Sequence, residues 1–243
     1  DALDALHIAI MKRKVNWVLD LDISKFFDTV EHDWLIRFIR HRIEDKRILK
    51  LITQWIKVGM LDEHGHRVKA TIGTPQGAVI SPLLANVYLH YSFDLWLDRW
   101  RKGSRGEVSI VRYADDSVIG FKDYMDAIDC RAHLTKRLAK FGLKLHPDKT
   151  KLIRFGRFAI PHGTGKATVG KEPGTFDFLG FTHYIGRKRS GEVIVKRKTS
   201  RKRLIAQLKL IREKLNKRMH DKPGATGVWL RKVVQGHINY YGV

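Results

Sequence analysis

Apolar and polar positions alternate with a period of two over residues 17–22, and this pattern predicts a strand. Asp20 and Asp22 share one face of that strand. Val18 lies on the same face, and Trp17, Leu19 and Leu21 form an apolar surface on the opposite face. The strand therefore presents two carboxylates on one side and an apolar surface on the other.

A second pair of strands is predicted at 108–113 and 117–121, where two β-rich runs are separated only by Ala-Asp-Asp. So short a polar interruption is a hairpin signal. Asp115 and Asp116 are therefore expected at the tip of this hairpin. Further strand-like segments lie at 151–155 and 176–184, with a glycine-rich loop at 156–174.

Helical periodicity predicts helices between and after these strands. In order, they cover 32–42, 45–58, 81–101, 127–141, 204–219 and 228–241. Ser81 and Pro82 are the expected N-cap and first-turn proline of the third helix. Gly142 stops the fourth helix, and Pro223-Gly224 ends the fifth. Strands and helices mixed in this way predict an α+β fold.

The basic charge is concentrated in the last quarter of the chain. Residues 187–243 carry 17 Lys and Arg against 3 Asp and Glu, a net charge of +14 out of +22. Within 204–219, apolar residues recur at helical spacing among cations, which predicts an amphipathic helix with a basic face. We therefore divide the chain into residues 1–186 and a basic region at 187–243.

The overall composition favours a polyanionic partner. The 243 residues include 47 Lys and Arg against 25 Asp and Glu, and the sequence pI is about 10.2. Nucleic acid explains this excess better than a merely solvated basic surface does.

The single cysteine, Cys130, excludes an internal disulfide and a cysteine-based zinc cluster, and we interpret it as a buried small hydrophobe. With no apolar run of membrane-spanning length and no signal-peptide pattern at Asp1, we expect a protein of the bacterial cytoplasm with no membrane partner.

Clustered carboxylates indicate a metal-dependent reaction. Joining a nucleotide to a 3′ end requires deprotonation of the attacking hydroxyl and charge stabilisation on phosphate and pyrophosphate. Two divalent ions about 3.5–4 Å apart meet both needs, and Mg²⁺ prefers hard carboxylate oxygens. Asp115, Asp116 and Asp22 can form such a cluster. An isolated Asp-Asp pair is more often a plain turn, so the interpretation depends on the neighbouring motifs.

Five blocks of the chain resemble, in the family's order, those of a group II intron reverse transcriptase. They are Asp22–Asp28 with Glu31-His32, Gly73–Gly77 through Ser81–Asn86, Tyr113–Asp116, His146–Lys151 and Phe178–Phe181. The segment from Arg197 to Gly242 also resembles the thumb, or maturase X, region of these proteins. One short match is weak, but five in order are specific, and the resemblance covers nearly the whole chain.

The resemblance implies a right-hand polymerase palm, an antiparallel sheet packed by helices, followed by a basic helical thumb. It also implies that Asp22, Asp115 and Asp116 bind two Mg²⁺ ions, for which Mn²⁺ can substitute. Periodicity alone does not choose between Asp20 and Asp22, whereas the family pattern selects Asp22. Asp20 and Asp28 keep a structural interpretation as solvated or capping acids.

Three further positions acquire roles from the resemblance. Phe27 matches a bulky residue beneath the incoming sugar, where a ring excludes a 2′-hydroxyl and so favours deoxynucleotides, and Ile23 belongs to the same nucleotide-binding block. In an extended strand Phe26 and Phe27 point to opposite faces, and periodicity does not tell which ring is core. Lys149 matches a lysine that donates a proton or positive charge to the leaving pyrophosphate, although most lysines only solvate a surface.

Gly73, Pro75 and Gly77 predict a constrained turn in which the backbone can approach a ligand closely. Gln76 offers both a donor and an acceptor. Without its neighbours this would be a plain turn. The resemblance implies that Pro75, Gln76 and Gly77 contact the incoming nucleotide.

Two regions are expected to hold nucleic acid. The family's primer grip, a hairpin that holds the primer 3′ end, is matched by Phe178, Leu179, Gly180 and Phe181. The alternation of these residues alone would predict a core strand. In the basic helix Arg203, Arg212 and Lys217 are expected to contact the phosphate backbone, and a solvated helix face is the alternative.

These motifs predict an RNA-directed DNA polymerase that extends a DNA or RNA primer on an RNA template with deoxynucleoside triphosphates, in the context of group II intron mobility. The alternative is a maturase that binds intron RNA and assists splicing without catalysis. Intact aspartates favour polymerisation. The fingers segment that family members carry before the region resembling residues 1–16 is missing, so we expect weak or no synthesis by the chain alone. The sequence predicts no particular oligomeric state.

Overall fold

The computed structural model describes residues 2–57, 60–61, 67–68, 72–74, 79–156 and 173–242. Its helices are α1 (Ala2–Lys12), α2 (Phe26–Thr29), α3 (His32–Arg40), α4 (Lys46–Lys57), α5 (Ser81–Leu89), α6 (Leu95–Trp100), α7 (Tyr124–Ala139), α8 (Arg201–Lys217) and α9 (Pro223–Tyr241). A π turn, η1 (His90–Asp94), joins α5 to α6, and a 3-10 turn, η2 (Arg101–Gly103), follows α6. The strands are β1 (Trp17–Leu21), β2 (Met60–Leu61), β3 (Arg67–Val68), β4 (Val108–Tyr113), β5 (Asp116–Phe121), β6 (Lys151–Arg154), β7 (Phe176–Phe178), β8 (Phe181–Arg187) and β9 (Val193–Thr199).

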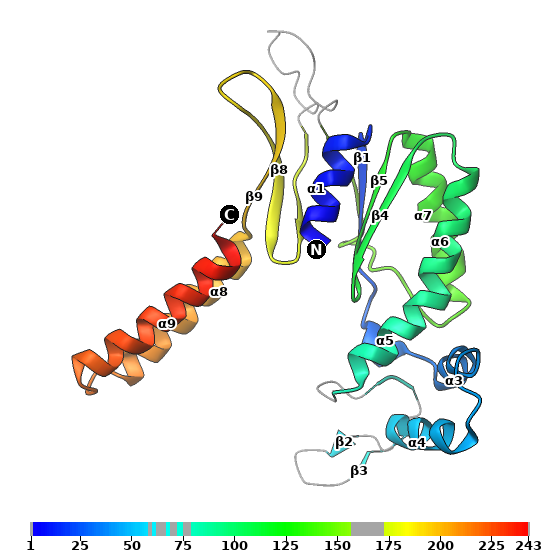
Figure 1. Cartoon of the computed structure of the whole chain (residues 1–243), viewed down its shortest axis with the longest axis horizontal. Helices are drawn as coiled ribbons and strands as arrows, with labels where there is room; N and C mark the ends of the chain where they lie inside the picture. The colour runs from blue at the N-terminus through cyan, green and yellow to red at the C-terminus, as the bar shows by residue number, and fades with distance from the viewer. Residues whose placement is uncertain are drawn as a thin grey trace.

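A four-stranded antiparallel sheet forms the centre of the larger lobe, with the order β4-β5-β1-β6 (Figure 1). β1 lies between β5 and β6, so that Trp17 pairs with Phe121 on one side and with Arg154 on the other. The α+β class is confirmed, and the segments predicted at 17–22, 108–113, 117–121 and 151–155 form β1, β4, β5 and β6. The segment predicted at 176–184 instead forms two strands, β7 and β8, joined by a turn. The sheet carries the segment after β1 to the same edge as the tip of the β4–β5 hairpin.

The two faces of this sheet bury different sets of residues, as the period of two predicted. Leu19 and Leu21 belong to a large apolar cluster with residues of α3, α5, α6 and α7. Val18 belongs to a second cluster, which includes Leu6 and Ile10 of α1 and residues of β7 and β9. The acidic face of β1 is therefore the face covered by α1 and the second sheet.

The segment predicted as one helix from 81 to 101 is interrupted. α5 ends at Leu89, and the π turn η1 precedes α6. The helix begins at Ser81 itself, with Ile80 at the N-cap position and proline in the first turn, so the predicted N-cap was placed one residue too late. A π turn depends on hydrogen bonds between residues five apart, which apolar periodicity does not reveal.

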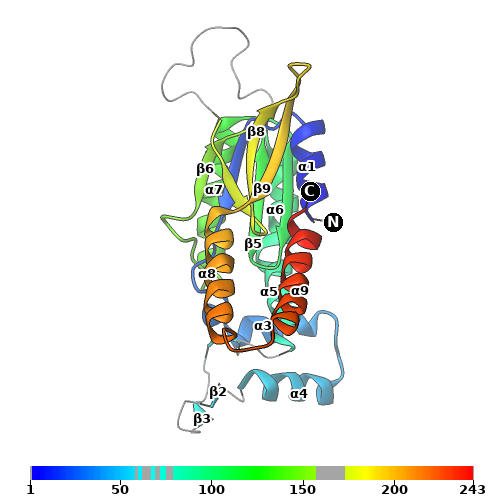
Figure 2. The same cartoon turned by 90° about the vertical axis from the view of Figure 1, so that its left-hand side faces the viewer.

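A separate antiparallel sheet, β7-β8-β9, follows the larger lobe. The predicted boundary between residues 186 and 187 falls inside β8, whose residues Phe181–Arg187 pair with β9. β9 itself was not predicted. From one end of this sheet α8 and α9 extend away as a pair (Figures 1 and 2). The final helix begins at Pro223 rather than at residue 228, because proline at the first helical position has no N–H to leave unbonded.

The apolar stripe of α8 is helical, as predicted, but it is exposed. On α8, Leu204 and Leu208 are 38% and 56% exposed. Met219, which was predicted to continue the stripe, lies in a turn beyond the end of α8 at Lys217 and is 74% exposed. No described residue of α8 or α9 is buried. Cys130, in contrast, is fully buried in the core, as predicted. Among the helices that the structure describes, none is long and apolar enough to cross a membrane.

Candidate active site

The register of the central sheet brings Asp22, Asp115 and Asp116 to the same end of its strands, which we call the sheet edge. Leu21 of β1 pairs with Ser117 of β5, and Tyr113 pairs with Asp116 across the hairpin. Asp22 follows Leu21 directly, so it stands level with the hairpin tip that carries Asp115 and Asp116. Asp22 is therefore a neighbour of the consecutive pair Asp115 and Asp116, from which it is 93 positions distant in the sequence.

The electrostatics of this edge are those of a crowded set of carboxylates. Partial burial raises the pKa of Asp116 above its usual value, and the charges of Asp115 and Asp22 raise it further. Burial raises the pKa of Asp20 to about 7, with additional contributions from Asp116 and Asp177. Like charges held this close favour a bound proton or cation.

Asp20 differs from its predicted role as a solvated acid, because it is half-buried on the acidic face. Asp177, on β7, was not predicted to approach the site. It belongs to the second sheet, and no local pattern signals that a residue more than 150 positions away will face β1. The Asp177 carboxylate accepts a hydrogen bond from Thr182 Oγ1 at 2.5 Å.

The donor set suits a hard divalent cation. Asp22, Asp115 and Asp116 supply carboxylate oxygens, and their mutual repulsion, visible in the pKa of Asp116, is the feature that a cation would relieve. In the described part of the chain no three acidic, imidazole or thiol groups are gathered at ligand spacing.

Lys149 is held near the acids because its segment is hydrogen-bonded to the residues that follow β1, at a contact that we call the clamp. His146 N–H donates to the carbonyl of Asp22 at 2.8 Å, and Ser24 N–H donates to the carbonyl of Lys144 at 2.8 Å. The Lys149 ammonium consequently lies 3.3 Å from Asp22 Oδ2. The structure thus brings together the predicted lysine and the first predicted aspartate, 127 residues apart.

A pocket of about 760 Å³ opens beside this clamp. The predicted residues Asp22, Ile23, Phe27, Asp115 and Lys149 line it. Lys25, Lys144 and His146, which the sequence reasoning missed, also line it. A pocket with two carboxylates at one end and three lysines around it suits a triphosphate with its metal ions. The Ile23 side chain is only 7% exposed, which leaves mainly its backbone for a ligand.

Phe26 and Phe27 were expected in an extended strand, but they begin the short helix α2. The helix follows Lys25, whose φ of 46° is left-handed. Phe26 is 2% exposed and belongs to the core. Phe27 is half-buried and its ring meets the ring of Phe26 edge-on at 5.4 Å. Both residues line the pocket, but Phe26 is buried in the core whereas Phe27 is the more exposed of the two.

The Gln76 turn lies partly outside the described residues: Pro75, Gln76 and Gly77 are not described. Gly73 is described, with a φ of 89°, and a Cβ at this position would come 2.9 Å from the carbonyl oxygen of Phe27. Thr74 N–H donates to that same oxygen at 2.7 Å. The start of the predicted turn is therefore attached directly to the pocket-lining helix α2.

The predicted primer grip is a tight hairpin between β7 and β8. Phe178 pairs with Phe181, and the two central residues, Leu179 and Gly180, have φ of 51° and 81°. Both phenylalanines are buried. The carbonyl of Leu179 accepts a hydrogen bond from Tyr240 Oη at 3.0 Å. The end of α9 thus holds the turn in place.

The predicted phosphate contacts lie on exposed parts of α8. Arg203 is the nearest to the acids, since its charge lowers the pKa of Asp116 and so opposes the effect of burial. Arg212 and Lys217 lie further along the helix. Of the three predicted contacts, Arg203 is therefore the one whose charge acts on the acidic residues.

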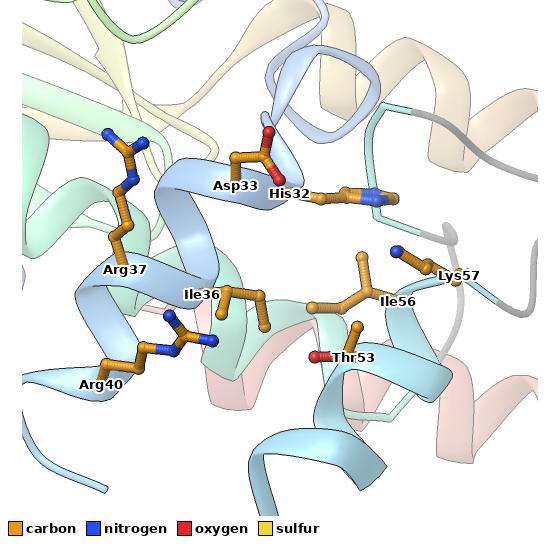
Figure 3. Close-up of a pocket in the computed structure, with 8 residues that line it drawn as sticks. All are labelled: His32, Asp33, Ile36, Arg37, Arg40, Thr53, Ile56 and Lys57. Atoms are coloured by element: carbon orange, nitrogen blue, oxygen red, sulfur yellow. The ribbon is translucent and has the colours of Figure 1, made fainter. Parts of the chain in front are cut away.

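A second pocket, of about 400 Å³, lies between α3 and α4 and shares no lining residue with the first (Figure 3). Ile36 and Ile56 form apolar walls, and Arg37, Arg40 and Lys57 surround them. Among the described residues that line it, Asp33 is the acidic one. This arrangement suits an anion rather than a metal ion.

Comparison with known proteins identifies the family. Residues 2–183 match the model of the reverse transcriptase (RNA-dependent DNA polymerase) family. The chain is 36% identical over 206 residues to protein YkfC of Escherichia coli, a match that covers 72% of this chain and 48% of YkfC. It is 42% identical over 74 residues to the group II intron-encoded protein LtrA of Lactococcus lactis, covering 30% of this chain and 12% of LtrA.

Solved structures give the same fold. A telomerase from Candida tropicalis superposes with a TM-score of 0.56 at 14% identity, covering 82% of this chain and 39% of the telomerase. The chain spans about half the length of YkfC, at 48%. From the family match, the intron-encoded relatives and the shared fold, we conclude that the chain belongs to the reverse transcriptase family and is related to its group II intron-encoded members.

Proposed function

We propose that the chain is the catalytic part of an RNA-directed DNA polymerase that extends a primer 3′ end on an RNA template with deoxynucleoside triphosphates. The observation that carries this proposal is the meeting of Asp22, Asp115 and Asp116 at one sheet edge, beside a pocket lined with lysines. Carboxylates there suit two Mg²⁺ or Mn²⁺ ions, which would activate the primer hydroxyl and stabilise charge on the phosphates.

The side chains have complementary tasks in this reaction. The primer 3′ oxygen forms a bond to the α-phosphorus, and the bond from that phosphorus to the pyrophosphate oxygen breaks. Asp22, Asp115 and Asp116 would hold the ions. Lys149, beside Asp22, would give its proton or its charge to the leaving pyrophosphate. The β7–β8 turn would hold the primer end, with Pro75, Gln76 and Gly77 contacting the incoming nucleotide.

The pocket position of Phe27 leads to a test of sugar selection. Replacing it with alanine (Phe27→Ala) should lower the preference for deoxynucleotides over ribonucleotides by at least about 10-fold, because the ring no longer excludes a 2′-hydroxyl. The measurement is single-nucleotide primer extension with matched deoxy- and ribonucleotides. Phe27→Tyr is the matched control, since it keeps the ring and should keep the preference. Unchanged selectivity in Phe27→Ala would remove Phe27 from the site.

The basic helix α8 leads to a test of phosphate binding. Arg212→Ala combined with Lys217→Ala should reduce the slope of log affinity against log salt by about 1 for each residue, as expected for lost phosphate contacts. The measurement is a salt titration of primer–template binding. The control is Arg131→Ala with Lys136→Ala, which removes the same charge from exposed positions on α7. Equal slopes in both pairs would mean that net charge, and not α8, determines binding.

A maturase that binds intron RNA is the second candidate. The relationship to intron-encoded proteins favours it, and the exposed basic helices α8 and α9 suit a large RNA surface. The two functions are compatible in one chain. They separate experimentally, because splicing assistance would survive loss of Asp115 and DNA synthesis would not.

A further inference from the structure

The guanidinium of Arg112, on β4, makes four hydrogen bonds to three partners. Nε and Nη2 donate to the two carboxylate oxygens of Asp94 at 2.7 and 2.5 Å. Nη1 donates to Asn86 Oδ1 at 2.8 Å and to the carbonyl oxygen of Ala114 at 2.7 Å. Only 14% of this side chain is exposed. One side chain therefore connects the α5–η1 helix to the peptide that precedes Asp115.

The hydrogen bond from Arg112 is made to a residue with a strained backbone, Ala114. It has a φ of 55°, in the left-handed region that alanine rarely adopts. Ala114 and Asp115 are the two central residues between the paired Tyr113 and Asp116, and a positive φ at the first central position normally selects glycine. The bond from Arg112 fixes the orientation of the strained peptide, and with it the directions of the two acids that follow.

The π turn accounts for the position of the partners of Arg112. Asn86 and Asp94 are eight residues apart, so in a regular α-helix they would point about 80° away from each other around the axis. The wider π turn rotates less per residue and brings Asp94 round towards the face that carries Asn86. Isolated π turns recur at functional sites. Here the irregularity lets one guanidinium bind both acceptors.

The effect of Arg112 on the acids is geometric. Its charge is matched by Asp94 in a bidentate ion pair. The charged neighbours that shift the pKa of Asp116 are Asp115, Asp22 and Arg203. Arg112 thus orients the acidic turn, while Asp115, Asp22 and Arg203 determine the electrostatic field at Asp116.

We propose that Arg112 is a positioning residue: through the Ala114 carbonyl it holds Asp115 and Asp116 in the direction needed to bind divalent cations, and Asn86 and Asp94 in turn hold Arg112. This inference rests on the proposed function, in which the two acids bind the ions. It assigns a task to a side chain that touches neither the ions nor the substrate.

The test is Arg112→Lys, which keeps the charge but cannot make the fork of bonds to Asp94, Asn86 and Ala114. Titration calorimetry with Mn²⁺ alone should show affinity weakened by about 10-fold, the lower end of the effect of residues that orient metal ligands. In primer extension, kcat should fall by a similar factor, while the KM for nucleotide stays unchanged. Circular dichroism establishes that the variants compared are folded.

Arg137→Lys is the matched control. Arg137 also anchors the π turn, by donating to the carbonyls of Tyr91 and Ser92, both at 3.1 Å, but it makes no described bond to the acidic turn. Its replacement should leave Mn²⁺ affinity unchanged. An equal loss in both variants would show that Arg112 only stabilises the helix, and would overturn the proposal.

A second variant tests the backbone argument. Adding Ala114→Gly to Arg112→Lys should recover part of the Mn²⁺ affinity, because glycine adopts a positive φ without strain. Wild-type affinity in Arg112→Lys, or no recovery in the double variant, would contradict the positioning role. If Mn²⁺ binding follows these expectations but the wild-type protein extends no primer, the proposed function fails and the role of Arg112 at the acids stands.

Discussion

Replacing Asp115 with asparagine is expected to lower the rate of primer extension on an RNA template by about 1,000-fold, equivalent to about 4 kcal/mol of transition-state stabilisation. Asparagine preserves the size of the side chain and its suitability for a turn, but it removes the negative charge that would bind a cation. The hairpin should therefore keep its structure. Binding of RNA should be nearly intact, since the basic surfaces are unchanged.

The comparison needs a control acid outside the cluster. Asp129 lies on α7, half exposed and 3.7 Å from Arg105, so Asp129→Asn removes the same charge without affecting the sheet edge. It should extend primers at the wild-type rate. Retained synthesis in Asp115→Asn, or its failure to fold, would count against the assignment of Asp115 as a metal ligand.

The second large effect concerns stability and pH. His183, on β8, is 3% exposed and its ring is stacked on Phe176 at 5.0 Å. Burial, aided by the charge of Arg197, lowers its pKa from 6.5 to about 4. Within the described part of the chain its Nε2 atom has no hydrogen-bond partner. The folded protein therefore holds a neutral imidazole that the unfolded chain would protonate.

The direction of the pH effect follows from linkage. Between about pH 6.5 and 4 the unfolded chain binds a proton at His183 that the folded protein does not, so stability is full above pH 6.5 and is lost as the pH falls towards 4. The loss from this residue should be about 3 kcal/mol. His183→Phe removes the titrating group and preserves stacking on Phe176. Chemical unfolding from pH 7 to pH 4 should show a flatter profile for this variant.

Exposed His220 provides the control for this measurement. His220→Phe makes the same substitution where the imidazole is already in water, and its pH profile should follow that of the wild-type protein. Parallel profiles for His183→Phe and wild type would show that His183 titrates in the folded protein as it does in water. The buried second cluster around β7 and β8 would then be more hydrated than its packing indicates.

The sequence predicted those features that depend on local pattern or on short motifs. The alternation in residues 17–22 correctly separated the face of β1 that packs on the helices from the face that carries the acids, and the short Ala-Asp-Asp interruption correctly placed two acids at a hairpin tip. The first result follows from the period of two in a strand, and the second from the turn signal between two β-rich runs. The roles of these acids still depend on the experiments above.

Long-range geometry accounts for what the sequence did not predict. Arg112 meets Asp94 and Asn86 across 18 and 26 residues, through a π turn that leaves no mark in the apolar period. The left-handed backbone at Lys25 turned Phe26 and Phe27 into a helix where a strand was expected. β9 was not predicted because its three consecutive cations, Lys196, Arg197 and Lys198, resembled part of the basic tail, whereas in the structure they continue a strand that begins with Val193 and buries Val195. In each case tertiary contacts overrode the local signal.

The most direct test of the acidic edge as a polymerase centre is incorporation of deoxynucleotides, directed by an RNA template, by the protein in its natural full length. With Mg²⁺ present, the primer should grow by the nucleotides complementary to the template, and chelation of the metal or Asp115→Asn should stop it. No incorporation by a protein that binds the primer–template, or incorporation that persists without divalent metal, would contradict the account.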